Sequence, residues 1–515
     1  MLTPQDHVED DERRAGLRRL ILEAGFANAA GALTTGVILT AFALQLGATN
    51  AVIGLLAALP FLCQLLQLPA ILLVERLRTR KRIAVLSSIA GRAMLLLMAG
   101  LAFAPNQPAL AGLIVAQAVF CGFAAIGSCA WNAWVRDIAP EESFGRIFAR
   151  RTFNATAVSL VAGLAAAILL DVTPERSAWR SAAFATLYSL GAVCGLISAA
   201  IVSRIPEPRM PPPATETLRL RPLLTEPFRD RNFVRLIRFL SSWQFAVNLA
   251  TPFFTVFIVR QLGYSMTFVM AASVASQVAN AAALNSWGLL SDRFSNKSVL
   301  SVTAPVYILA IAAMIAAGQF ESRTTGAAYL VFLHIVMGVC VAGVTLASAN
   351  IALKLSPKGS ATAYMAACAM ITSVAAGVAP ILGGLFADFF AARRLEVLLR
   401  WTEPGGLTLL RPLTVSHWQF YFLMAAAIGL YALHRLSFVR EEGEIRRREM
   451  VAQVLLETRR VVRNVSSVAG LRALTALPAG FLREASLRAR LQRRINSHPG
   501  REARPGTGRW RGNTP

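Results

Sequence analysis

Long apolar stretches separated by short polar clusters fill the chain from residue 20 to residue 439. Each stretch has the length of about 20 residues that an α-helix needs to cross the hydrocarbon core of a bilayer. Backbone groups in lipid must be hydrogen-bonded within their own segment, so we predict about twelve transmembrane helices. The predicted spans are residues 20–46, 51–74, 83–104, 109–135, 152–171, 179–203, 235–260, 266–290, 298–318, 327–353, 361–390 and 417–439.

Composition agrees with this pattern. The chain has 515 residues, of which 55% are hydrophobic and 16% charged, whereas soluble domains carry about 25% charged residues. The predicted fold class is therefore an all-α polytopic membrane protein. The opening sequence MLTPQDHVEDDERR is acidic where a signal peptide is basic, so we interpret the first apolar stretch as a retained span.

Two landmarks recur at one spacing and indicate a duplicated unit. The stretch WGLLSDRFSNK (Trp287–Lys297) and the shorter ERLRTRKR (Glu75–Arg82) both lie between apolar runs, and their acidic residues are 292 − 75 = 217 positions apart. The loop prolines Pro140 and Pro357 give the same offset, since 357 − 140 = 217. We therefore predict two related halves of six helices each.

The chain then divides at a proline-rich segment. We expect a cytoplasmic N-terminal segment (1–19), an N-terminal six-helix half (20–203), a cytoplasmic Pro-rich linker (204–234), a C-terminal six-helix half (235–440) and a basic cytoplasmic tail (441–515). Lys and Arg gather in loops such as 76–82 but are absent from 47–50, which places both termini in the cytoplasm of a bacterial inner membrane. The loop 391–416 is longer than its counterparts and has room for a short helix of its own.

The formal charge of +24 has two interpretations. We favour contact of basic loops with anionic lipid over nucleic-acid binding, because the basic residues lie beside apolar spans and in the tail. The tail is either a solvated segment or a helix on anionic lipid. The six cysteines form no CxxC pair, so we expect no metal site and no cofactor. The expected partners are a small-molecule substrate and the bilayer, for a monomer without nucleic acid.

The stretch Trp287–Lys297 resembles a loop signature of the major facilitator superfamily, Gly-x-x-x-Asp-Arg-x-Gly-Arg-Arg. Gly288, Asp292, Arg293 and Lys297 occupy matching positions, and Ser295 replaces the second Gly. The first-half copy departs further, because Glu75 replaces Asp and Arg78 replaces the second Gly. The segment WNAWVRDIAPEESFGRIFARR (131–151) is similar to an uncharacterised bacterial subgroup of the same family.

This resemblance implies two pseudo-symmetric six-helix halves that rock about a central site, with helices 1, 4, 7 and 10 lining the cavity. It also implies that the signature loops gate the cytoplasmic side. The alternative is that these loops only fix topology, since Asp-Arg loops also orient spans. The gating candidates are Glu75, Arg76, Gly288, Asp292, Arg293 and Lys297.

Ionisable residues inside spans are costly and are usually functional or paired. Glu23 in helix 1 is a candidate proton-linked carboxylate, or else a snorkelling group at the interface. His334 in helix 10 is a second proton candidate, or else a hydrogen-bonded structural histidine. Arg92 lies roughly 13 Å into helix 3, which indicates either an anionic substrate or an internal ion pair. Asp388 is expected to reach water near the end of helix 11.

Neutral amides are more numerous on the predicted cavity helices. They suggest a neutral, amphipathic or zwitterionic solute, although hydrogen bonds between helices explain some amides without function. The candidates are Asn28, Asn132, Gln244, Asn248, Asn280, Asn285 and Asn350.

We therefore predict a secondary active transporter of a small organic solute, coupled to protons. The alternative is a non-transporting membrane receptor or scaffold of the same fold that acts through its basic tail. An enzyme is not expected, because the sequence shows no nucleophile–base constellation. No phosphate-binding Gly-x-x-x-x-Gly-Lys-Ser/Thr loop is present, so ATP is not the expected driver.

Overall fold

The computed structural model describes residues 4–6, 8–138, 144–174, 177–210, 225–357, 361–403 and 406–441. Within this part, twelve helical spans of 21 to 36 residues are apolar enough to cross a membrane, which confirms the predicted number. The first span begins at Asp10 rather than at residue 20. Three acidic residues occupy its first turn, where the helix dipole favours negative charge.

The first half contains six spans, two of which are composite. Span 1 breaks after Thr34, and the chain passes through Gly36 with φ 59° before it continues. Span 2 changes to a short 3₁₀ turn in its middle. The elements are α1 (Asp10–Thr34), α2 (Val37–Gln45), α3 (Asn50–Leu62), η1 (Cys63–Leu66), α4 (Gln67–Leu77), α5 (Arg80–Leu101), α6 (Asn106–Ile138), α7 (Phe144–Val172) and α8 (Ala178–Ser203).

The second half repeats the same order of spans after a short turn, η3 (Glu226–Phe228). Its first span ends in a π-helical turn and its third in a 3₁₀ turn. The elements are α10 (Arg231–Val256), η4 (Phe257–Gln261), α11 (Met266–Arg293), α12 (Asn296–Ala313), η5 (Met314–Gln319), α13 (Arg323–Lys354), α14 (Ala361–Phe390) and α15 (His417–Ser437).

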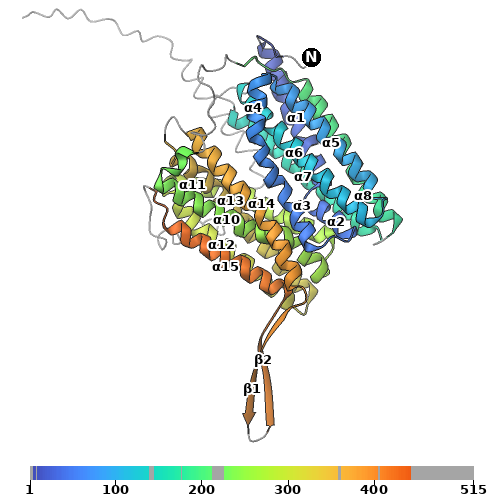
Figure 1. Cartoon of the computed structure of the whole chain (residues 1–515), viewed down its shortest axis with the longest axis vertical. Helices are drawn as coiled ribbons and strands as arrows, with labels where there is room; N and C mark the ends of the chain where they lie inside the picture. Colours follow the sequence, from blue (N-terminus) through green and yellow to red (C-terminus); the bar gives the residue numbers. More distant parts are fainter. Residues whose placement is uncertain are drawn as a thin grey trace, which may run out of the picture. The chain divides into compact units, whose positions relative to one another are not determined.

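A β-hairpin joins α14 to α15 and projects away from the helices (Figure 1). Strands β1 (Arg394–Glu403) and β2 (Gly406–Ser416) pair antiparallel, from Arg394↔Ser416 to Glu403↔Gly406. The expectation of a short helix in this loop is therefore wrong. The sequence EPGG between the strands is rich in turn-forming residues, which favours a hairpin over a helix.

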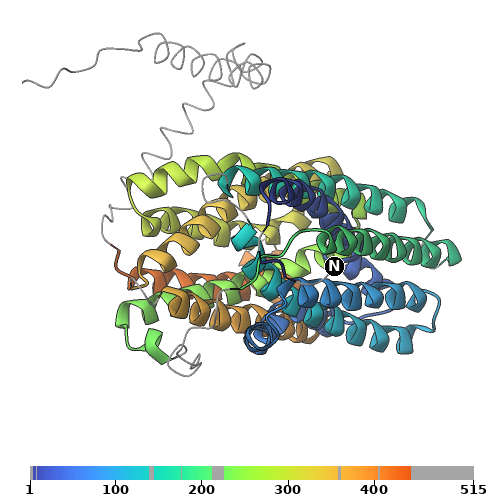
Figure 2. The same ribbon diagram turned by 90° about the horizontal axis from the view of Figure 1, so that it is seen from above.

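Each half is a bundle, and two helix pairs form the most extensive contacts between the halves. In the first half α1 packs against α7 and α8, and in the second half α10 packs against α14 and α15. Between the halves, α3 lies along α14 and α11 lies against α7. Figures 1 and 2 show the blue-to-teal helices of the first half beside the green-to-orange helices of the second. Gly54 and Gly384 let α3 and α14 approach closely, because a Cβ on either residue meets the backbone of the other helix.

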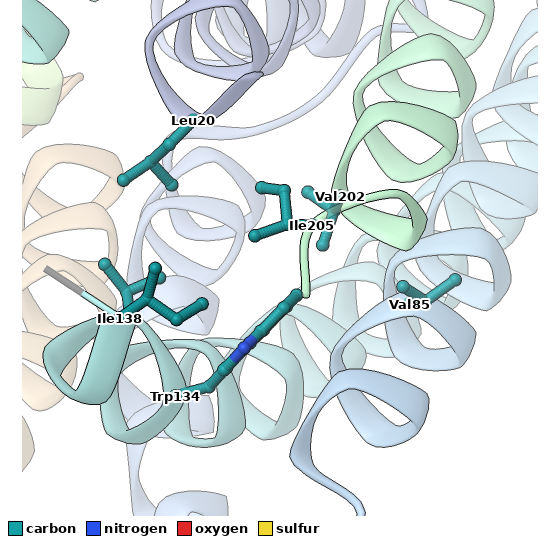
Figure 3. Close-up of a cluster of buried hydrophobic side chains, with 7 residues drawn as sticks. Leu20, Val85, Trp134, Ile138, Val202 and Ile205 are labelled. Atoms are coloured by element: carbon teal, nitrogen blue, oxygen red, sulfur yellow. The ribbon is translucent and has the colours of Figure 1, made fainter. Parts of the chain in front are cut away.

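We distinguish the two ends of the bundle by name. The clamp end is where α3 and α11 begin and where α7 and α14 end; the basic end is the opposite one, where α4, α6 and α13 end. At the basic end, a buried cluster in the first half surrounds Trp134 (Figure 3). Trp134 Nε1 donates a 2.9 Å hydrogen bond to the carbonyl oxygen of Pro206, which fixes the chain that leaves α8.

This anchored segment carries Glu207, four residues beyond the end of α8 (207 − 203 = 4), and its side chain is fully buried. Its Oε1 accepts a 2.7 Å hydrogen bond from the backbone N–H of Arg80, the first residue of α5. Burial raises the pKa of the Glu207 carboxyl, and the N–H groups of Arg80 and Lys81 act against that rise. Since Thr79 makes no side-chain capping bond, Glu207 takes the place of an N-cap for α5.

Glu441 plays the same part in the second half, again four residues beyond the last helix (441 − 437 = 4). Its Oε2 accepts a 2.7 Å hydrogen bond from the N–H of Lys297 at the start of α12. Its Oε1 accepts from Asn296 Nδ2 at 2.9 Å and from Lys354 Nζ at 3.1 Å. Each half therefore fastens the start of its third span with a buried glutamate that follows its sixth span.

We expect Glu441→Ala to lower the thermal unfolding midpoint of the purified protein in detergent. The substitution leaves the N–H of Lys297 and the amide of Asn296 in a buried position without their acceptor, which costs about 1–3 kcal/mol. Glu321→Ala is the control, because Glu321 is exposed and lies at the clamp end. Equal shifts in the two variants would contradict the capping role of Glu441.

Candidate functional site

A cavity of about 730 Å³ lies between the two halves, and both halves line it. We call it the central cavity. The residues that line it lie in the middle of their spans and towards the clamp end. Examples are Thr35–Thr40 at the break between α1 and α2, Ile53 on α3, and Ile258 at the end of span 7. The break at Gly36 therefore places irregular backbone at the cavity wall, where such backbone is tolerated in membrane proteins.

The central cavity is mostly apolar, with a few neutral polar groups. Among the described residues that line it, none is Asp, Glu, Lys or Arg. Gln117 is 2% exposed, and its Oε1 has no donor within the described part of the chain. Such a cavity suits an uncharged or weakly polar molecular body. The main hydrogen-bonding groups are Gln64, Gln117, Asn248, Gln277, Tyr307 and His334.

His334 lines the central cavity and is buried. Its Nδ1 lies 2.8 Å from the carbonyl oxygen of Leu330 on its own helix. A carbonyl only accepts, so Nδ1 carries the proton and Nε2 remains available as an acceptor. His334 therefore forms a backbone hydrogen bond and also lines the central cavity.

Of the seven predicted amides, Asn248 alone belongs to the central cavity as described. Asn28 and Asn248 each donate to the carbonyl oxygen four residues earlier on their own helix, Ala24 and Gln244 respectively, at 2.8 Å. Asn132, Asn285 and Asn350 are exposed, whereas Gln244 and Asn280 are half-buried. A role for these six amides along the path of a solute stays a prediction.

A second cavity of about 230 Å³ lies within the first half, and we call it the charged cavity. Its ionisable lining residues are Glu23 on α1, Arg92 on α5 and Arg151 on α7. Glu23 is 5% exposed; its Oε1 accepts from Ser198 Oγ at 3.0 Å and its Oε2 lies 3.5 Å from Arg151 Nη2. Glu23 is therefore a buried, paired carboxylate and not a snorkelling group.

The two guanidinium groups of the charged cavity lie on aromatic rings. Arg151 lies 4.6 Å from the ring centroid of Trp131, and Arg92 lies 5.4 Å from that of Phe120. Both contacts are cation–π interactions that partly replace hydration. Phe120 and its neighbour Ala124 line the central cavity as well, so the two cavities adjoin.

Two aspartates join the halves at the clamp end. Asp388, at the end of α14, accepts hydrogen bonds from the N–H groups of Asn50 at 3.1 Å and Ala51 at 2.8 Å, where α3 begins. Asp171, at the end of α7, accepts from the N–H groups of Met266 at 2.9 Å and Thr267 at 2.7 Å, where α11 begins. We call these two sets of bonds the aspartate clamps.

The aspartate clamps are related by the repeat, since 388 − 171 = 217 and the capped helices begin 266 − 50 = 216 positions apart. Each places a carboxylate on the N-terminus of a helix from the other half, where the helix dipole and free N–H groups favour an anion. They hold the halves together beside the clamp-end wall of the central cavity.

The predicted gating residues lie at the basic end. Asp292 and Arg293 are the last two residues of α11, and both are exposed. The Arg293 guanidinium lies 5.2 Å from the ring centroid of Phe294. Glu75 and Arg76 are exposed at the end of α4, and Glu75 pairs with Arg78 one turn away at 3.9 Å. Lys297 is buried where Glu441 caps α12, and Gly288 is half-buried on α11. Their gating role stays a prediction.

A family model described as Major Facilitator Superfamily matches residues 22–332 and, in a second match, residues 244–484. The chain belongs to the Major Facilitator Superfamily. It is an integral membrane protein with the fold of that family, two pseudo-symmetric halves of six helices each. No curated protein matches the chain.

Solved structures of this superfamily share the fold at low sequence identity. A mutant form of the nucleoside transporter NupG is 13% identical with a TM-score of 0.62, over 83% of this chain and all of that chain. A D-xylose–proton symporter is 13% identical with a TM-score of 0.61, over 84% and 99% of the two chains. A bacterial homologue of the human lysosomal transporter Spinster, inward-facing and occupied, is 17% identical with a TM-score of 0.57, over 90% and 100%.

We expect Asp388→Asn to shift the protein towards a form that is open at the clamp end. Loss of the charge weakens the interaction with the helix dipole by roughly 0.3–1 kcal/mol, which changes the ratio of the two forms by a factor of about two to five. Spin labels at Gln107→Cys and Glu321→Cys, two exposed sites on opposite halves at the clamp end, report the separation by pulsed electron paramagnetic resonance. The native cysteines are replaced in all samples.

Asp230→Asn is the matched control for this measurement. Asp230 also caps a helix, α10, through the N–H groups of Asn232 and Phe233, but it does so within its own half. Its substitution should leave the separation of the labels unchanged. An unaltered distance distribution in the double variant Asp171→Asn/Asp388→Asn would show that the clamps do not hold this end closed.

Proposed function

We propose that this superfamily member is a secondary active transporter that moves a small organic solute by alternating access. The observation that carries the proposal is the position of the central cavity. Both halves line it, and the aspartate clamps join the halves at one end of the bundle. Release of the clamps, with closure at the basic end, exposes the same cavity to the other side.

The positive-inside rule supports an orientation for this movement. Arginines and lysines gather where spans 2 and 3, 4 and 5, and 6 and 7 meet, so the basic end faces the cytoplasm of a bacterial inner membrane. In this proposal the clamp end faces outwards, so clamps that join the halves there belong to an inward-facing form. The tail from residue 442 onwards, for which contact with anionic lipid was predicted, lies outside the described residues.

The central cavity supports a substrate with a weakly polar or apolar body. A volume of about 730 Å³ lies within the range of 300–1,000 Å³ that is typical for small-molecule sites. The structural neighbours include a nucleoside transporter and a D-xylose–proton symporter, both named for small organic solutes. Amides at the cavity wall suit hydroxyl, amide or ring-nitrogen groups of such a solute.

Glu23 is our candidate for the proton-linked group. It is buried, it is paired with Arg151 by a single long contact of 3.5 Å, and it lies beside the central cavity. Protonation of Glu23 releases Arg151 from this pair, so one proton changes the charge next to the solute. His334 is the second candidate, through its free Nε2 at the cavity wall.

The alternative function is that of a receptor or scaffold of the same fold, which the experiments must distinguish from a transporter. It shares the two halves and the cavity, but its cavity need not open to both sides. The spin-label measurement above distinguishes the two, because a transporter populates both separations of the halves as its solute is added.

We expect a ligand screen by thermal stability, over nucleosides, pentoses and amphipathic drugs, to find a solute that raises the unfolding midpoint. A ligand at 100 times its dissociation constant stabilises a protein by about 2.7 kcal/mol, which is readily measured. The variant Asn248→Leu keeps the side-chain size but removes the amide, so binding should weaken roughly tenfold. Asn106→Leu, at an exposed amide of the clamp end, is the control. An equal affinity in both variants would exclude Asn248 from the site.

We also expect Asp292→Asn to reduce uptake of that solute into proteoliposomes several-fold while the amount of protein in the membrane stays constant. Asp292 stands at the exposed end of α11, where a gate at the basic end has to form when the halves close. The measurement is the initial rate per inserted protein, beside Asp230→Asn. A loss of protein that matches the loss of uptake would support a topology anchor.

A further inference from the structure

The charged cavity holds more positive than negative charge. Its ionisable lining residues are one carboxylate, Glu23, and two guanidinium groups, Arg92 and Arg151. With all three groups ionised, the sum is +1. A net charge inside a membrane-spanning bundle is costly unless a partner neutralises it.

Arg92 is attracted by the charge of Glu23 but forms no ion pair with it. Within the part of the chain that the structure describes, it makes no ion pair, and its buried Nε has no hydrogen-bond acceptor. Its contact is the face of Phe120 at 5.4 Å. An arginine that is held in place on a ring, with its guanidinium at a cavity, is suited to bind an oxyanion.

A glycine on the neighbouring helix makes room for Arg92. A Cβ at Gly195 on α8 would lie 2.3 Å from Arg92 Cδ and 2.4 Å from its Nε, so glycine is required for this position of the side chain. Ser87 and Ser88 on α5 line the same cavity and offer hydroxyl donors, and Ser128 on α6 lines it while donating to the carbonyl oxygen of Ala125. Both the cationic group and its polar surroundings are therefore built from several helices.

Arg151 is a second cation that becomes available on protonation of Glu23. The two groups are 3.5 Å apart at Arg151 Nη2 and Glu23 Oε2, and the Arg151 guanidinium also lies over the ring of Trp131. The charged groups that face Glu23 are Arg151 from α7 and Arg92 from α5, while α8 contributes Ser198 and α6 contributes Trp131. An incoming anion and Glu23 thus compete for the same guanidinium.

We propose that the charged cavity binds the anionic group of the solute, a carboxylate, sulfonate or phosphate, through Arg92 and Arg151. The proposal rests on the proposed transport function in one respect only, namely that the bound anionic group belongs to the transported solute. Since Phe120 and Ala124 border both cavities, the body of the solute lies in the central cavity while its anionic end enters the charged cavity. A proton taken up by Glu23 from water balances the charge that the anion brings.

The test uses a pair of probes that differ in charge but hardly in shape, benzenesulfonate and benzenesulfonamide. Benzenesulfonate keeps its charge from pH 5 to pH 8, so any pH dependence belongs to the protein. We expect the full-length protein in neutral detergent to bind the sulfonate at least tenfold more tightly than the sulfonamide, measured by titration calorimetry. Equal binding of the two probes, or binding of neither, would overturn the proposal.

Two matched pairs of variants assign the site. Arg92→Gln should weaken sulfonate binding at least tenfold, whereas Arg82→Gln, at an exposed arginine of the same helix, should not. Arg151→Gln and the exposed neighbour Arg150→Gln form the second pair. Arg92→Lys keeps the charge and shows whether loss of folding explains the first result. Equal affinity in Arg92→Gln and the native protein would overturn the site.

The proposal also predicts the direction in which the affinity for benzenesulfonate changes with pH. Sulfonate should bind more tightly as pH falls, because protonated Glu23 no longer holds Arg151. Glu23→Gln should bind the sulfonate more tightly than the native protein at pH 8 and lose the pH dependence. A pH dependence that persists unchanged in Glu23→Gln would overturn the coupling to this carboxylate.

A lipid phosphate is the other source of an anionic group. In nanodiscs, phosphatidylglycerol that competes with benzenesulfonate in the native protein but not in Arg92→Gln would support the site with a headgroup as its ligand. Absence of such competition, with the sulfonate still bound, would support a soluble anion. Anion binding without any exchange between the two separations of the halves would refute transport while leaving the site in place.

Discussion

A carboxylate set against the N-terminus of another helix recurs at four positions in the part of the chain that the structure describes, and the arrangement of the spans depends on it. Glu207 and Glu441 cap α5 and α12 within their own halves, whereas Asp388 and Asp171 cap α3 and α11 across the halves. The free N–H groups of a helix start need acceptors, and a helix end in a membrane protein finds few of them in lipid. Each carboxylate satisfies this need with a group from a distant part of the chain.

The two kinds of cap have different mechanical consequences. The buried glutamates lie at the basic end, and each joins the end of the sixth span to the start of the third span within its own half. The exposed aspartates lie at the clamp end and tie one bundle to the other. Exposed caps contribute only about 1 kcal/mol each, so water can replace them at a small cost. Strong caps inside the halves with weak caps between them are the arrangement that rigid-body exchange about a central cavity requires.

Hydropathy was sufficient to predict the spans because lipid imposes length and apolarity on each helix independently. The aspartate clamps were not predicted, since the partners are 338 and 95 residues apart and Asp388 was expected only to reach water. It is exposed as expected, but it also bonds to α3. The repeat offset of 217, which located the signature loops, also relates Asp171 to Asp388 and was the available signal. The hairpin β1–β2 lies outside the spans, where hydropathy carries no information about structure.

The cavity residues show a second limit of prediction from the sequence. The position of a helix in the order of spans does not tell which of its faces points towards the cavity. Asn28 and Asn248 each donate to a carbonyl oxygen of their own helix, yet only Asn248 also lines the central cavity. Arg92 shows the converse. Helix 3 is not among the helices that the family resemblance assigns to the cavity, yet Arg92 reaches a cavity beside the central one. It does so because Gly195 leaves the space that its side chain occupies, and a glycine on the sixth span gives no sign of this in the sequence. The chemistry of this site is therefore decided by packing between two helices that family position alone would have set aside.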